Sequence, residues 1–290
     1  MPADTPPPRR KWHFQRWLTV FIVATLCWSG WRAYAFRSAL AEARALGWQV
    51  EYTDPNGEIR KDWKAAFRKD TWLEGVTWLS IETGQAFERH CAIVHRLNPK
   101  ALNVKNAASL RDLSALKPLI RLEKVAIYHC TELNNVDALK NLASLQRLEI
   151  GECTALTSID AIKNLSALRI VYLHCTGLTN IDALKNLSAL DSVSLLGCAG
   201  LTNVDALKNL SALNTLYLVD CTGLKNVDAL MSLSKLEMLV VHGCTGLTNV
   251  DAFKNLSALK QVVLRGCTRL PKESVAALRA ALPNANIISP

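Results

Sequence analysis

A unit of 22 or 23 residues recurs through the second half of this 290-residue chain. Its most regular part reads DALKNL or a near copy, and a cysteine stands at the same place ahead of each copy. The cysteines are Cys130, Cys153, Cys175, Cys198, Cys221, Cys244 and, in a divergent last unit, Cys267. A unit this short cannot enclose a core alone, so neighbouring units must stack and bury their apolar faces against each other. The sequence therefore predicts a solenoid.

Each unit contains a stretch in which apolar residues alternate with variable ones. Ahead of Cys198 the apolar residues are Leu190, Val193 and Leu195, and the same frame, LxxLxLxxCxxL, returns from coil to coil. A period of two is typical of a β-strand, with the first, fourth and sixth places of the frame facing inward. Successive coils should therefore place their strands side by side in one parallel sheet.

An aspartate opens the return segment of each coil, directly before an ALKNL-type sequence. We expect a short helix there with the aspartate as its N-cap, because the side chain can accept a backbone N–H and its charge suits the helix start. A calcium-binding ladder is the alternative, but Ca²⁺ needs about six to eight oxygens around one point. Successive carboxylates should instead lie about 4.8 Å apart. The aspartates are Asp137, Asp160, Asp182, Asp205, Asp228 and Asp251.

These motifs resemble the leucine-rich repeat family, in which Asn or Cys occupies the ninth place of LxxLxLxx(N/C)xL. The resemblance covers Ala107 to Leu270, and LTNVDALKNLSAL is similar to the short bacterial, internalin-like class. It implies an α/β fold, a right-handed solenoid with a parallel sheet on its concave side and short helices on its convex side. It also implies recognition through the concave sheet, and it does not imply an enzyme.

The cysteines are interpreted as core residues. Seven of the nine stand in the repeat column, which contains no CxxC pair, and Cys27 and Cys91 stand outside it. A free cysteine at an inward corner behaves as a small buried hydrophobe. We therefore predict no disulfide.

Residues 17–31, WLTVFIVATLCWSGW, carry no charge and follow the basic stretch PRRKWHFQR. We expect a transmembrane anchor over residues 17–36, because a span needs about 20 residues and Arg32 can extend its guanidinium to the interface. A cleaved signal peptide ending at Ala35 is the alternative, since the sequence AYA before the cut resembles a processing site. Arg32 so close to that site argues against cleavage.

Five parts of the chain follow from these features. They are a cytoplasmic basic tail (1–16), the anchor (17–36), a membrane-proximal N-terminal cap (37–74), the leucine-rich repeat solenoid (75–270) and a C-terminal cap (271–290). In the N-terminal cap we expect a strand around Val50 and Tyr52 and a helix carrying Trp63 and Phe67. In the C-terminal cap, Pro271 should open a longer helix and Pro283 should end it. The basic tail favours a cytoplasmic N-terminus. We expect a single-pass protein of the bacterial inner membrane with the solenoid on the periplasmic side, or a secreted protein if the chain is cleaved.

The outward places of the strands differ strongly from coil to coil, while the rest of the unit hardly changes. Tyrosine and arginine, which supply most interface anchors, occur among them. We therefore expect a non-enzymatic, membrane-anchored protein that binds a protein or cell-envelope ligand through its concave sheet. A structural spacer of the envelope and a secreted binding effector, cleaved near Ala35, are the alternatives. The candidate ligand-binding residues are Tyr128, Glu149, Tyr172, His174, Tyr217, His242 and Arg265.

No catalytic, cofactor or metal site is expected. His129 and His174 should lie about 10 Å apart and His242 about 14 Å further on, too far for one zinc ion to bridge. The net charge of +9 is spread among acidic residues. A nucleic-acid-binding protein would gather its Lys and Arg on one face, so we expect no nucleic-acid partner.

Overall fold

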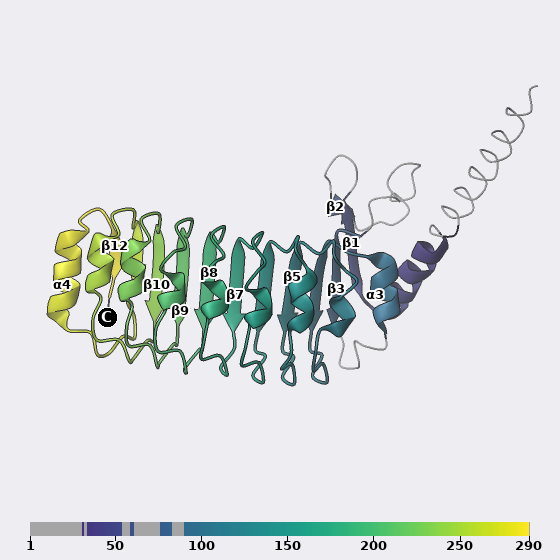
Figure 1. Cartoon of the computed structure of the whole chain (residues 1–290), viewed down its shortest axis with the longest axis horizontal. Coiled ribbons are helices and arrows are strands. Elements are labelled where there is room, and N and C mark those ends of the chain that lie inside the picture. The colour runs from purple at the N-terminus through teal and green to yellow at the C-terminus, as the bar shows by residue number, and fades with distance from the viewer. Residues whose placement is uncertain (1–30, 32–33, 54–58, 61–75, 83–89, 290) are drawn as a thin grey trace, which may run out of the picture.

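The computed structural model describes residues 31, 34–53, 59–60, 76–82 and 90–289. Within them, a single sheet runs the length of the molecule in the strand order β12-β11-β10-β9-β8-β7-β6-β5-β4-β3-β1-β2 (Figure 1). From β3 onward every neighbouring pair is parallel. These strands are β3 (Trp78–Glu82), β4 (Ala101–Lys105), β5 (Lys124–Tyr128), β6 (Arg147–Gly151), β7 (Ile170–His174), β8 (Ser192–Leu196), β9 (Thr215–Val219), β10 (Met238–His242), β11 (Gln261–Val263) and β12 (Asn286–Ile288).

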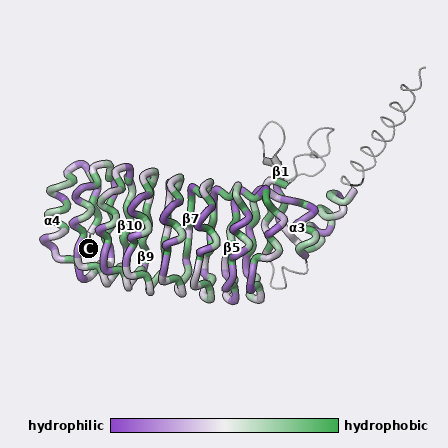
Figure 2. Tube along the Cα trace, viewed as in Figure 1, coloured by the Kyte–Doolittle hydropathy of each residue, from purple (hydrophilic) through white to green (hydrophobic). Residues whose placement is uncertain are grey.

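The strands form where the frame predicts them, and each place of the frame pairs with the same place in the next coil. Val193 of β8 lies opposite Leu216 of β9, and Leu195 opposite Leu218. These four side chains are fully buried. Hydrophobic and hydrophilic stretches accordingly repeat from coil to coil in Figure 2. The predicted alternation of inward and outward residues is confirmed.

The return segments contain 3₁₀-helices of three or five residues rather than α-helices. A coil of about 23 residues leaves room for only a short helix, and that helix places apolar side chains such as Leu184 and Leu207 in the core. The helices of neighbouring coils stack on one another as the strands do. They are η2 (Ser114–Leu116), η3 (Asp137–Asn141), η4 (Asp160–Ile162), η5 (Asp182–Leu184), η6 (Asp205–Leu207), η7 (Asp228–Ser232) and η8 (Asp251–Asn255).

The prediction that the aspartates are N-caps is wrong. In η7 the N-cap is Val227, and Asp228 is the first residue of the helix. The Asp228 backbone N–H donates to Oδ1 of Asn226 at 2.6 Å, and Asp228 itself is exposed. The core takes an apolar residue as the N-cap, and the side chain two residues upstream of the aspartate accepts the hydrogen bond from the first helical N–H. Residues that accept this hydrogen bond are Asn135, Ser158, Asn180, Asn203, Asn226 and Asn249, and the aspartates concerned are Asp137, Asp160, Asp182, Asp205, Asp228 and Asp251.

The cysteine column lies in the core at the end of the strands. Each of its seven members is at most 2 % exposed, as the frame predicts. The thiol of Cys244 lies 3.4 Å from the carbonyl oxygen of Leu218 in the preceding coil and 3.6 Å from that of His242. Burial raises the pKa of the Cys175 thiol to about 12 and that of Cys267 to about 11. These groups therefore stay protonated and are poor nucleophiles.

The residue before the cysteine, at the eighth place of the frame, has left-handed backbone geometry. Its φ is 56° at His129, 54° at Asp220 and 66° at Gly243, and Asn106, Glu152, Gly197 and Gly266 share the conformation. The reversal turns the eighth-place N–H toward the next coil. There it donates to the seventh-place carbonyl, for example from Asp220 to His242 at 2.7 Å. The coil that ends at Cys175 has one residue fewer and lacks this place.

At the N-terminal side, residues 34–45 are helical and are followed by β1 (Gln49–Thr53), which pairs antiparallel with β3 and with β2 (Ile59–Arg60). The strand predicted around Val50 is confirmed. Helix α3 (Cys91–Leu97), which was not predicted, joins β3 to β4. The helix expected near Trp63 and nearly all of the anchor at 17–36 lie outside the described residues. Among the helices that the structure does describe, none has the length and hydrophobicity needed to cross a membrane.

The C-terminal end departs from the repeat as expected. Helix α4 (Lys272–Ala281) begins directly after Pro271 and ends ahead of Pro283. Strand β12, which was not predicted, then pairs with β11, and Ile287 packs into the core opposite Val262.

Replacing Asn226 with alanine should lower the free energy of unfolding by about 1 kcal/mol, because the Asp228 N–H loses its acceptor. Asp228→Ala should cost less, since that side chain caps nothing. Urea denaturation of both variants and the parent checks this. Equal losses in the two variants would contradict the stabilising role of the hydrogen bond to Asn226.

Candidate functional site

The outward places of the strands form one continuous surface, which we call the open face of the sheet. It consists of the third, fifth and seventh places of the frame in β3 to β11. Because the strands are in register, the fifth-place residues Glu149, Tyr172 and Ser194 lie in one row, and the seventh-place residues Gly151, His174 and Leu196 in another. Most of these side chains are partly exposed.

Two tyrosines meet on this face across a glycine. Tyr128 of β5 and Tyr172 of β7 have ring centroids 6.4 Å apart at an interplanar angle of 52°. The strand between them contributes Gly151, whose missing side chain makes room for the Tyr128 ring. A Cβ atom at Gly151 would clash with Cδ1 of Tyr128. The pair is therefore a contact between alternate coils that depends on a glycine at the seventh place.

A carboxylate completes this tyrosine cluster, which consists of Tyr128, Tyr172, Glu149 and Arg147. The Tyr128 hydroxyl donates to Glu149, and the Arg147 guanidinium donates to the other carboxylate oxygen. Burial, and then the hydrogen bond to Glu149, raise the pKa of Tyr128 well above its usual value. Burial also raises the pKa of Tyr172, and the Glu149 charge adds to the effect. The cluster thus presents two neutral phenols beside a compensated ion pair.

The histidines do not form a site together. His129 Nδ1 lies 2.7 Å from Glu152 Oε2 at the edge of the sheet, and both side chains are half exposed. His174 is on β7, and His242 is on β10, three strands further along the sheet. No cluster of three or more His, Cys, Asp or Glu side chains that could hold a metal ion occurs within the described part of the chain.

The remaining predicted ligand-binding residues lie toward the C-terminal end. The Tyr217 hydroxyl donates to the Met238 sulfur at 3.0 Å, which holds the ring against the neighbouring strand. His242 and Arg265 are exposed, and Arg265 lies beyond the end of β11. The structure thus brings Tyr128, Glu149 and Tyr172 together, with His174 two places beyond Tyr172 on β7, and leaves the other three residues apart from them.

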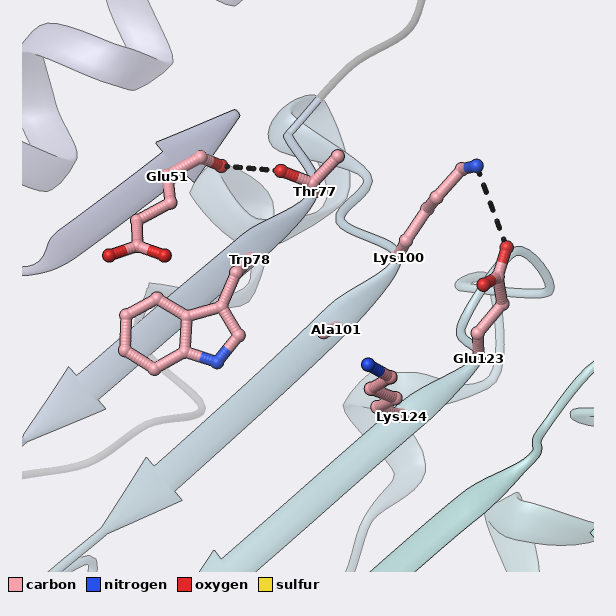
Figure 3. Close-up of a pocket in the computed structure, with 7 residues that line it drawn as sticks. All are labelled: Glu51, Thr77, Trp78, Lys100, Ala101, Glu123 and Lys124. Atoms are coloured by element: carbon pink, nitrogen blue, oxygen red, sulfur yellow. Dashed lines mark hydrogen bonds and ion pairs between the residues drawn. The ribbon is translucent and has the colours of Figure 1, made fainter. Parts of the chain in front are cut away.

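A hollow that sequence reasoning missed lies on the same face, where β3, β4 and β5 begin (Figure 3). Its volume is about 320 Å³. Three third-place residues line the hollow along its length, Trp78, Ala101 and Lys124. Ala101 lies in register between Trp78 and Lys124. No third-place residue is among the predicted ligand-binding residues, although the period of two also turns the third place outward. The other lining residues are Glu51, Thr77, Lys100 and Glu123.

The rim of the hollow carries both signs of charge. Lys100 Nζ lies 3.6 Å from Glu123 Oε1, and both side chains are about 40 % exposed. On the opposite side, the Thr77 hydroxyl donates to the backbone carbonyl of Glu51 at 3.2 Å, which ties β3 to β1. Figure 3 shows the Glu51 carboxylate beyond the Trp78 indole, away from the lysines.

Comparison with known proteins identifies the repeat. A family model described as a BspA type leucine rich repeat region matches residues 103–224 and 170–272, in six copies. Among solved structures, internalin C2 from Listeria monocytogenes is 24 % identical, over 77 % of this chain and 90 % of that one, with a TM-score of 0.58. The leucine-rich repeat domain of the type III effector XopL is 18 % identical, over 100 % of this chain and 98 % of that one, with a TM-score of 0.48. No curated protein sequence matches the chain.

Replacing Glu149 with glutamine should lower the pKa of Tyr128, because the negative charge that opposes formation of the phenolate is removed, although burial still acts. The raised pKa in the folded state stabilises the protein below the unfolded-state pKa of about 10, and this contribution is lost as the pH rises through the folded-state value. Absorbance titration of tyrosinate in the parent and the variant checks the order of ionisation. Tyr128→Phe assigns the signal, and ionisation of Tyr128 together with exposed tyrosines in the parent would contradict the described environment.

Proposed function

The chain belongs to the family of BspA type leucine rich repeat regions, and on this premise we propose that it is a non-enzymatic binding protein. Its open face would recognise a protein partner. The observation that carries the proposal is the tyrosine cluster, where residues from three successive strands form one contiguous surface.

The distribution of sequence variation supports this function. Buried places of the frame and the return segments hardly change between coils, because each must pack on its neighbours. The outward places do not pack in the core, and their residue types vary widely between coils. Constant residues are needed for stacking, whereas the variable residues of the open face are suited to the recognition of one partner.

The composition of the cluster has the character of an interface centre. Tyrosine combines a large apolar ring with a polar tip, and aromatic residues and arginine are enriched among residues that dominate binding energy. The Arg147–Glu149 ion pair fixes the Tyr128 hydroxyl, so that little side-chain entropy remains to be lost on association.

We also propose that residues 17–36 anchor the chain in the bacterial inner membrane, with the solenoid on the periplasmic side. The uncharged segment 17–31 motivates this proposal. Two aromatic residues near the C-terminal end of the proposed anchor add support, because Trp31 and Tyr34 are 66 % and 73 % exposed. Such side chains favour the headgroup layer of a membrane.

Combined replacement of Tyr128 and Tyr172 by alanine should reduce recovery of the partner at least about tenfold, because two interface anchors are lost. The full-length protein is crosslinked in its native membrane, captured and compared with the variant by mass spectrometry. Lys140→Ala with Lys163→Ala, on exposed return segments, is the matched control. Partners retained equally by the tyrosine variant would argue for the structural-spacer alternative.

The anchored form should stay with the membrane during alkaline carbonate extraction and should keep residues 1–35 in its intact mass. Ala24→Arg places a charge at the centre of the apolar segment, which costs about 2.5–3.5 kcal/mol of insertion free energy. This variant should be partly released. A mature chain that begins after Ala35 in the wild-type protein would show cleavage and secretion instead.

A further inference from the structure

We propose that the hollow formed by Trp78, Ala101 and Lys124 binds an acidic side chain of the partner together with an apolar side chain next to it. The inference rests on the proposed function, since the hollow belongs to the same open face. This part of the face would recognise a carboxylate with a flat or apolar neighbour.

The shape of the hollow comes from one small residue between two large ones. Ala101 is 8 % exposed and forms the floor in the middle strand, while Trp78 and Lys124 rise from the strands on either side (Figure 3). The volume of about 320 Å³ is enough for two medium-sized side chains. The partly exposed Trp78 indole offers a flat apolar wall.

The hollow is lined by two carboxylates and two ammonium groups, but Lys124 is not paired with either carboxylate. Lys124 lies directly opposite Arg147 of β6, and like charges in this position repel each other. Arg147 is engaged by Glu149 in the tyrosine cluster. Figure 3 shows the Lys124 side chain turned the other way, toward Ala101. Its ammonium group makes no ion pair with any residue that the structure describes.

The neighbouring charges do not neutralise Lys124. The Lys100–Glu123 pair is long and exposed, and it occupies the start of the strands. The Glu51 carboxylate lies beyond the indole (Figure 3). The Lys124 ammonium group, which no described carboxylate pairs, therefore faces a pocket with an apolar wall. A carboxylate beside an apolar group complements both features, because a charged hydrogen bond and a ring contact form together.

The matched probes for this site are two dipeptides, acetyl-phenylalanyl-aspartate amide and its asparagine analogue. The full-length protein is labelled with fluorotryptophan, and Trp78→Phe assigns the Trp78 signal in the fluorine NMR spectrum. The aspartate dipeptide should shift this signal with a Kd of about 1 mM. Lys124→Gln should weaken binding at least about tenfold. Ala101→Leu, which fills the hollow, should abolish it, and Lys140→Gln on a return segment should leave it unchanged.

Several outcomes would overturn the inference. These are an unshifted Trp78 signal, equal shifts with both dipeptides, full binding by Lys124→Gln, or a stronger response to glucuronate than to the aspartate dipeptide. The last outcome would assign the hollow to an acidic sugar.

The alanine variant of Tyr128 and Tyr172 should bind the aspartate dipeptide as the parent does. If partner capture depends on the tyrosines but the dipeptide does not bind, the hollow is not a binding site and the proposed function stands. If the dipeptide binds but partner capture does not depend on the tyrosines, the hollow is a binding site and the tyrosine cluster is not the recognition site.

Discussion

The stacking of coil on coil is the interaction on which every other feature of this protein depends. A single coil buries its leucines only when another coil covers them, and each fully buried leucine contributes about 1.5–3 kcal/mol. Stacking also holds the strands in strict register, so that each place of the frame lies beside the same place in the next coil. The side chains at each place of the frame therefore form a row along the molecule. Rows at the inward places are apolar, and rows at the outward places are variable.

The strand ends show how the backbone is satisfied in such a stack. Carbonyl groups that emerge into the core need donors, and the cysteine thiols lie against them, as Cys244 does with Leu218. On the outer side, the left-handed eighth place directs an N–H to the next coil, as Asp220 does to His242. Glycine is favoured at this place because it adopts positive φ without strain, yet His129 and Glu152 adopt it too. The inter-coil hydrogen bond therefore offsets the conformational cost.

Periodicity alone was sufficient to predict the strands of the repeat and the buried cysteines, because these follow from which side chains must leave water, and the two prolines gave the place of the C-terminal helix. It was insufficient for the caps, since Asn226 and Asp228 are both good capping residues and only the position of the buried Val227 decides between them. The contact of Tyr128 with Tyr172 depends on how the Tyr128 ring lies over Gly151. The repeat pattern does not predict such a side-chain orientation. The hollow was missed because it arises from three different residues at one place of the frame, none of which forms a motif alone.

The two ends of the sheet have a consequence for association between copies of the chain. A parallel sheet that simply stopped would offer a full strand edge to another molecule, and such edges promote polymerisation. Here β11 and β12 are three residues long against five in the inner strands. At the other end β1 runs antiparallel and β2 has only two residues. Neither end repeats the geometry of the interior, so one molecule is a poor template for the growth of a fibre by the next.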